Sequence, residues 1–133
     1  MKIYLQKHLA ENFAQCNIFI TFAMRLTIWS EDFSVFYGSL QPNVKEKADY
    51  VLGIISDMKI LSSKIVKKLV KTEFYELRIS LGQEYRVIVL PLDNENIIEA
   101  EIILLLNGFV KKSTKDYKKQ ISIAKNTLKQ LEK

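Results

Sequence analysis

The chain has 133 residues, of which 48% are apolar and 26% charged, a composition that fits one globular domain and excludes a disordered or fibrous protein. Its apolar stretches are broken by polar residues before they reach the roughly 18–20 residues that a membrane helix needs, so we expect no membrane span. Cys16 is the only cysteine, which excludes an internal disulfide and favours a reducing cytoplasm.

The formal charge of +5 is concentrated in the second half of the chain. Residues 1–63 hold six basic and six acidic side chains, whereas residues 64–133 hold fourteen and nine, so the excess (14 − 9 = 5) lies entirely there. From Val110 onward, eight lysines accompany only two acids. Clustered positive charge favours binding of phosphate polyanions, although a solvated lysine face would have the same composition.

The first 23 residues show only a weak structural pattern, and we interpret them as an extension that precedes a domain over residues 24–133. Lys2 and Lys7 stand before an apolar segment, as in a signal peptide, but polar residues interrupt that segment and disfavour a secretory signal. An upstream start codon is an alternative explanation of the extension.

A strand and two helices are predicted next along the chain. The alternating run Arg25–Trp29 suits a first strand, and Ser30 is a candidate N-cap for a helix that continues to Leu40. Pro42 suits the start of a second helix, whose apolar residues recur at helical spacing to about Asp57. These two segments predict a helical hairpin. Residues 62–70 are predicted to form another short helical turn.

The periodicity then changes from helix to strand. Residues 73–79 alternate as in a half-buried strand, which places Phe74, Glu76 and Arg78 on one side and their neighbours on the other. Further strands are predicted over residues 85–92 and 97–106, with turns at 82–83 and 93–96. A last helix presents one apolar face, formed by Tyr117, Ile121, Ala124, Leu128 and Leu131. The order predicts an α+β fold with the helices packed on one face of a small antiparallel sheet.

Several kinds of catalytic site are excluded by residue content. The four glycines are scattered singly, so there is no glycine-rich phosphate loop. His8 is the only histidine and Cys16 the only cysteine, which leaves no usual set of zinc ligands. We therefore predict a site without a metal or a cofactor.

A group of cations remains as the candidate site. If the two strands pair through the turn near residue 82, Arg78 and Arg86 lie close together, and Lys111 and Lys112 leave the end of the next strand. Such a cluster could hold a phosphodiester and stabilise the negative charge of its transition state. The alternatives are structural. Arg78 could pair with Glu76 or Glu73, Arg86 could pair with Glu99 or Glu101, and residues 111–119 could form a solvated turn.

Three motifs in order along the chain resemble those of a known family. They are Tyr-Glu-Leu-Arg at 75–78, Tyr-Arg at 85–86 and Gly-Phe-Val-Lys-Lys-Ser at 108–113. Together they are similar to the RelE/HigB toxin superfamily, and within it to the phage-derived HigB-like branch. The resemblance extends from about Leu26 to Lys133.

The resemblance implies a RelE/ParE-like fold and the toxin of a type II toxin–antitoxin system. Such toxins cut mRNA in the ribosomal A site without a metal and are held by an antitoxin, here a HigA-like helix-turn-helix protein. By motif, the residues with an implied catalytic role are Arg78, Arg86 and Lys112. The residues with an implied RNA-binding role are Lys111, Lys115, Tyr117, Lys118, Lys119 and Asn107.

Two positions depart from the family pattern. Asn107 stands where the family often has histidine, so any proton transfer at that position is lost here. Lys115-Asp116-Tyr117 replaces the usual Lys-Thr-Pro after the double lysine. Two alternatives stay open. Asn107 and the N-terminal extension are consistent with a decayed toxin that binds RNA or antitoxin without cutting. The same fold also occurs in ParE-like proteins, which poison DNA gyrase and need no cationic nuclease site.

Overall fold

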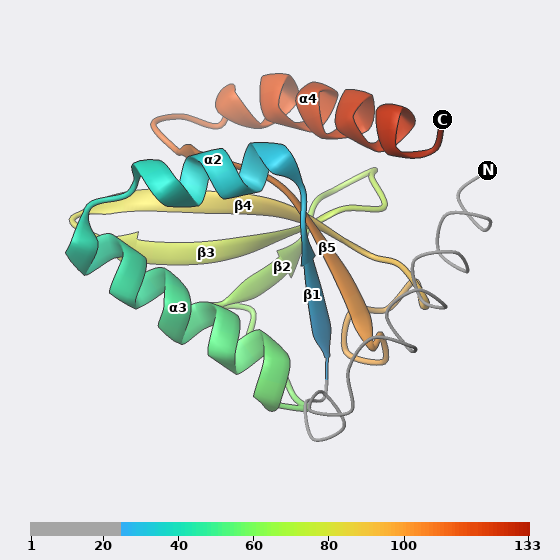
Figure 1. Ribbon diagram of the computed structural model, residues 1–133, viewed down its shortest axis with the longest axis horizontal. Coiled ribbons are helices and arrows are strands. Elements are labelled where there is room, and N and C mark those ends of the chain that lie inside the picture. The colour runs from blue at the N-terminus through green and yellow to red at the C-terminus, as the bar shows by residue number, and fades with distance from the viewer. Residues whose placement is uncertain (1–24) are drawn as a thin grey trace.

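A five-stranded sheet forms the centre of the protein in the computed structural model, which describes residues 25–133 (Figure 1). In chain order the elements are β1 (Leu26–Trp29), α2 (Glu31–Ser39), α3 (Pro42–Asp57), β2 (Val66–Lys68), β3 (Tyr75–Leu81), β4 (Gln83–Pro91), β5 (Ile102–Val110) and α4 (Asp116–Leu131). The predicted α+β fold, with a helical hairpin, a small sheet and a C-terminal helix, is confirmed. The expected extension over residues 1–23 lies outside the described residues.

The sheet is mixed rather than wholly antiparallel. Its strand order is β1-β5-β4-β3-β2, and β2 to β5 pair in antiparallel fashion, of which the meander of β3, β4 and β5 was predicted. β1 differs, because it pairs in parallel with β5, and Leu26 lies opposite Ile102. A parallel pair needs a long crossover connection, and the partner of such a strand lies too far along the chain for a local pattern to reveal it.

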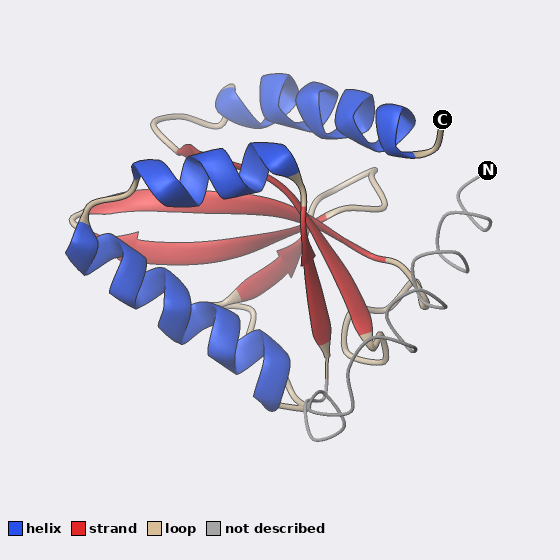
Figure 2. Cartoon of the chain, in the orientation of Figure 1, coloured by secondary structure: helices blue, strands red, loops and turns tan. Residues whose placement is uncertain are grey.

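Helices cover both faces of the sheet, so the prediction of helices on one face is wrong (Figure 2). α2 and α3 pack on the face that carries Val87 and Val89, whereas α4 packs on the face that carries Ile88 and Leu90. Successive strand residues point to opposite faces, so an unbroken apolar run in β4 requires cover on both sides. No helix among residues 25–133 is long and apolar enough to cross a membrane.

The helical hairpin begins and ends as its sequence predicts. The Ser30 side chain accepts a hydrogen bond from the backbone N–H of Phe33 at 3.1 Å, which caps α2. Pro42 occupies the first turn of α3, where its missing N–H costs nothing. The buried residues of α3 are four members of the predicted apolar face, namely Val44, Ala48, Val51 and Ile55.

Two segments differ from the prediction. Residues 62–70, predicted as a helical turn, contain the short edge strand β2, in which Val66 lies opposite Leu77 of β3. The strand predicted from residue 97 begins at Ile102, and residues 92–101 form a loop. Asp93 holds this loop, because its carboxylate accepts hydrogen bonds from the backbone N–H groups of Glu101 and Ile102.

Arg25, which directly precedes β1, connects that strand to the end of α3 and to the loop before β5. Its side chain is buried, with the residue only 2% exposed, and its guanidinium donates five hydrogen bonds to backbone carbonyls. The acceptors belong to the end of α3 and to the loop before β5: Ile55, Met58, Lys59, Ile97 and Ile98. Arg25 therefore caps the C-terminus of α3 from outside the helix, where carbonyl groups lack partners and a positive charge is favourable.

Gly108 in β5 lies directly beneath the ring of Phe36 from α2. A Cβ atom at this position would overlap three ring carbons of Phe36. We expect Gly108→Ala to lower the free energy of unfolding by about 1–3 kcal/mol, because the ring must shift within a packed core. Urea denaturation measures this change.

Gly53 in α3 provides the matched control, since an added Cβ there meets no atom within 4 Å. Gly53→Ala is expected to raise the free energy of unfolding by about 0.5–1 kcal/mol through the better helix propensity of alanine. Equal urea midpoints for Gly108→Ala and the unchanged protein would show that Phe36 moves aside at no cost.

Candidate active site

The two arginines of the candidate site lie directly opposite each other. The register of β3 and β4 pairs Arg78 with Arg86, as the sequence predicted from the turn between them. Both side chains share the α4 side of the sheet with Glu76, two residues before Arg78. Like charges opposite each other in a sheet repel, so a counter-charge is needed at this point.

Glu76 supplies that counter-charge. It is only 2% exposed, and its Oε1 accepts a hydrogen bond from Arg78 Nε at 3.1 Å. Its Oε2 lies 3.7 Å from Arg86 Nε and accepts no hydrogen bond within residues 25–133. The structural alternative in which Arg78 pairs with Glu76 is therefore present, whereas Arg86 pairs with Glu76 and Glu84 rather than with the alternatives Glu99 and Glu101.

Arg86 is buried, with only 4% of its surface exposed, and each guanidinium nitrogen has a partner. Nε donates to the Tyr117 hydroxyl at 3.2 Å, Nη1 to the Tyr85 carbonyl at 3.0 Å and Nη2 to Glu84 Oε1 at 3.3 Å. Burial disfavours the charge of Arg86, but the bonds to Tyr117 and Glu84, with the Glu76 carboxylate, outweigh it and raise its pKa. Arg86 therefore holds other groups in place.

Tyr117 brings the first turn of α4 against the sheet. Its ring and that of Phe109 pack in a T-shaped arrangement with the centroids 5.7 Å apart, and Lys111 Nζ lies 5.5 Å from the centroid of the Tyr117 ring. Burial raises the pKa of the Tyr117 phenol, and the neighbouring Glu76 carboxylate raises it further. The hydroxyl is therefore protonated near neutral pH and is available as a hydrogen-bond donor.

Two cations lie at the open side of this buried network. The Arg78 side chain is 30% exposed, and its two terminal nitrogens have no partner among residues 25–133. Lys111 is half-buried over the Tyr117 ring, and its backbone N–H donates to the Glu84 carbonyl at 2.7 Å. Three cations, Arg78, Arg86 and Lys111, thus surround two carboxylates, which leaves a net positive site suited to a phosphate group.

The remaining predicted lysines lie on the loop before α4 and on its first turn. Lys112, Lys115, Lys118 and Lys119 are all exposed. Asp116 holds the loop, since its Oδ2 accepts hydrogen bonds from the backbone N–H of Lys112 at 2.7 Å and of Ser113 at 3.0 Å. These two bonds lower the pKa of the Asp116 carboxyl. The lysine-rich segment therefore has a defined path beside the arginines.

Asn107 lies beneath α4, away from the surface. The residue is 4% exposed, and its side-chain Nδ2 donates to the side-chain oxygen of Gln120 at 3.0 Å. Its Oδ1 is buried without a hydrogen-bond partner among the described residues. A direct contact between Asn107 and RNA would require α4 to move.

Sequence reasoning missed one member of the site and the shared role of another. Glu76 was considered only as a partner of Arg78, and Glu84 was not considered at all. The alternation of β3 did place Glu76 beside Arg78, but only the register of β4 reveals that Arg86 shares it. No group of three His, Cys, Asp or Glu side chains gathers within the described part of the chain.

Comparison with known proteins places the chain in a family. The model of the phage-derived Gp49-like proteins (DUF891) matches residues 36–129, which are 94 of the 133 residues. Searches of curated proteins and of solved structures returned no significant match. The matched range begins at Phe36 and contains β2 to β5, the arginine pair and nearly all of α4. The chain therefore belongs to the phage-derived Gp49-like family, which is part of the RelE/HigB-like toxin family.

Proposed function

We propose that this protein is the toxin of a type II toxin–antitoxin system and that it cuts mRNA on translating ribosomes in the cytoplasm. Its family supports a toxin. The nuclease activity is supported by the exposed end of Arg78 and by the half-buried Lys111, which lie on either side of the buried network of Glu76, Arg86 and Tyr117. A protein that acts only by contact with gyrase has no need of this arrangement.

The proposed reaction is attack of a ribose 2′-hydroxyl on the adjacent phosphorus. The new P–O bond forms as the bond to the 5′-oxygen breaks, so the products are a 2′,3′-cyclic phosphate and a 5′-hydroxyl. Water accepts the proton of the 2′-hydroxyl, and the leaving 5′-oxygen takes a proton from water. Arg78 and Lys111 stabilise the added negative charge on the phosphate oxygens, which accounts for catalysis by positioning and electrostatics without a metal.

The residues divide into two roles in this proposal. Arg78 contacts the scissile phosphate. Lys112 lies on the loop between β5 and α4. Arg86 acts as a positioning residue, because all its nitrogens are engaged within the protein. The exposed lysines bind the RNA, and the basic surface that they form is also the surface we propose a HigA-like helix-turn-helix antitoxin covers.

Induction of the chain in bacterial cells, followed by mapping of mRNA 5′ ends, tests the proposal. We expect growth arrest with new 5′-hydroxyl ends inside translated codons, and no new ends in RNA that carries no start codon. Arrest with intact mRNA would refute the nuclease function and indicate gyrase or another protein target. Absence of arrest, with RNA bound but uncut by the purified chain, would indicate the decayed module.

A further inference from the structure

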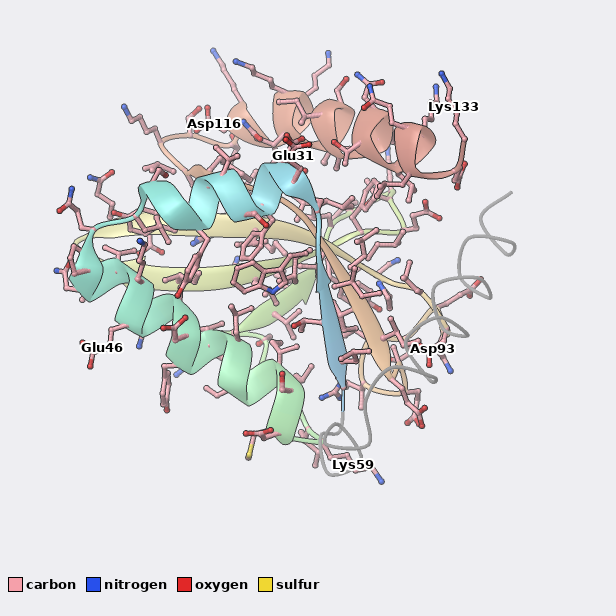
Figure 3. The ribbon with its side chains drawn as sticks, in the orientation of Figure 1. Glu31, Glu46, Lys59, Asp93, Asp116 and Lys133 are labelled. Carbon is pink, nitrogen blue, oxygen red and sulfur yellow. The ribbon has the colours of Figure 1, made fainter. Side chains whose placement is uncertain are left out.

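A row of lysines follows one flank of α4 beyond the candidate active site. With 3.6 residues per turn, Lys118, Lys125 and Lys129 fall within a narrow arc, and Lys133 follows just past the helix. All four residues are exposed. Figure 3 shows nitrogen-tipped side chains projecting from α4 between two labelled residues, Asp116 at its start and Lys133 just past its end.

The counter-charges on this helix lie at its two ends. Asp116 is its first residue and Glu132 its C-cap, and no Asp or Glu occurs between them. Lys125 and Lys129 are four residues apart, a spacing at which like charges destabilise a helix. A polyanion along this flank would relieve that repulsion.

A cavity lies on the same flank. It has a volume of about 510 Å³ and is bordered by Lys125 of α4 and by Lys68 and Lys71 of the β2–β3 segment. Figure 1 shows the loop between β2 and β3 rising toward the C-terminal half of α4. Glu73 and Glu95 also line the cavity, so its cations exceed its anions by one (3 − 2 = 1) before the rest of the α4 row is included.

The position of the cavity shows that the row leads to it. Thr127 faces the opposite flank of α4, where its hydroxyl donates to Asp32 of α2 at 3.0 Å. The flank with Lys118 and Lys125 therefore faces away from α2 and toward the β2–β3 loop. Lys118 is next to Tyr117 of the candidate active site, and seven residues at about 1.5 Å each place Lys125 roughly 10 Å further along.

We infer that this lysine track, formed by Lys118, Lys125 and Lys129 of α4 with Lys68 and Lys71, binds the phosphate backbone of RNA on one side of the scissile phosphate. The inference rests on the proposed function and assigns that substrate a path and a second anchoring site. Lysine is depleted from the cores of protein–protein interfaces, whereas interfaces with nucleic acid are strongly positive, so the track fits RNA better than a protein.

The test compares two triple variants of the full chain that carry the same change in net charge. The track variant is Lys71→Ala, Lys125→Ala and Lys129→Ala. The control is Lys45→Ala, Lys47→Ala and Lys64→Ala, on α3 and the segment that follows it. The probe is a single-stranded 2′-O-methyl RNA, which lacks the attacking hydroxyl, and its affinity is measured by fluorescence anisotropy over a range of salt concentrations.

We expect the track variant to bind the RNA roughly 100-fold more weakly at about 0.1 M salt, and its plot of log affinity against log salt to be less steep by about 2. The control should keep most of its affinity and slope. Equal losses in both variants, or no loss in the track variant, would overturn the inference. So would unchanged RNA binding with weakened binding of polyglutamate, which would indicate an acidic protein.

The result is separable from the proposed function. If the chain binds RNA through the lysine track but leaves translated mRNA uncut, the lysine track is supported and the nuclease function is refuted. If the chain cuts mRNA but both triple variants bind the probe equally, the nuclease function is supported and the lysine track is refuted.

Discussion

Arg78→Ala is expected to slow mRNA cleavage on translating ribosomes by about 10²–10³-fold, the loss typical when one preorganised donor to a developing negative charge is removed. Among the guanidinium nitrogens of the site, the two terminal nitrogens of Arg78 are the ones that donate no hydrogen bond to an atom of residues 25–133. The measurement is the single-turnover rate on ribosomes programmed with a defined mRNA. Lys112→Ala is expected to lower the cleavage rate less than Arg78→Ala does, because Lys112 is an exposed lysine on a loop.

Stability and catalysis must be separated at this position, since Arg78 also pairs with buried Glu76. Arg78→Ala is expected to lower the free energy of unfolding by about 1–2 kcal/mol, because one carboxylate oxygen loses its donor. Arg78→Lys keeps a cation beside Glu76 but loses the planar fork, so its cleavage rate should fall while its stability stays near that of the unchanged protein. Normal cleavage by Arg78→Lys would show that charge alone suffices there.

Arg86→Ala provides the contrast between a residue that contacts the phosphate and one that positions its neighbours. Removal of this guanidinium leaves Glu76 with one cation and the Tyr117 hydroxyl without its donor. We therefore expect a loss of stability of about 3–5 kcal/mol together with the loss of cleavage. A folded, stable Arg86→Ala variant with the catalytic defect alone would reassign Arg86 to the phosphate.

Arg25→Met is expected to lower the free energy of unfolding by about 3–5 kcal/mol, a loss as large as that predicted for Arg86→Ala. Methionine has nearly the length of arginine and keeps much of its packing, so the change isolates the five hydrogen bonds to backbone carbonyls. Those carbonyls lie at the end of α3 and in the loop before β5, and both segments lose their shared donor. Urea denaturation followed by circular dichroism measures the loss.

Arg25→Lys is the matched control, because it keeps the charge near the C-terminus of α3 but offers fewer donors. The free energy of unfolding of Arg25→Lys should lie between that of the unchanged protein and that of Arg25→Met. If Arg25→Met unfolds at the urea concentration of the unchanged protein, water must replace the guanidinium at these carbonyls, and Arg25 would have no structural role.

Local patterns predicted most of the fold and the centre of the candidate site. Helical spacing identified α3, and the alternation of β3 placed Phe74 and Glu76 on one side of the sheet. The short turn at Gly82, which has a positive φ of 72°, fixed the register that brings Arg78 opposite Arg86. These features depend on residues close together in the chain, and therefore the sequence alone reveals them.

The features that the sequence did not reveal depend on distant partners. β2 has three residues, and the apolar residues in and around it, Ile65, Val66 and Leu69, are spaced as in a helix, so only its pairing with β3 makes it a strand. The burial of Arg25 depends on carbonyls 30 to 73 residues away. The engagement of Arg86 by Tyr117 depends on where α4 packs, which no local pattern of charges records.

The parallel pairing of β1 with β5 has a consequence for synthesis of the chain. Leu26 is made early, but its partner Ile102 is made 76 residues later (102 − 26 = 76), and Tyr117 later still. The sheet therefore closes, and the buried network assembles, only when almost the whole polypeptide has left the ribosome. A nascent or truncated chain that lacks α4 has no complete site, so the proposed activity against translation would begin only once the protein is finished.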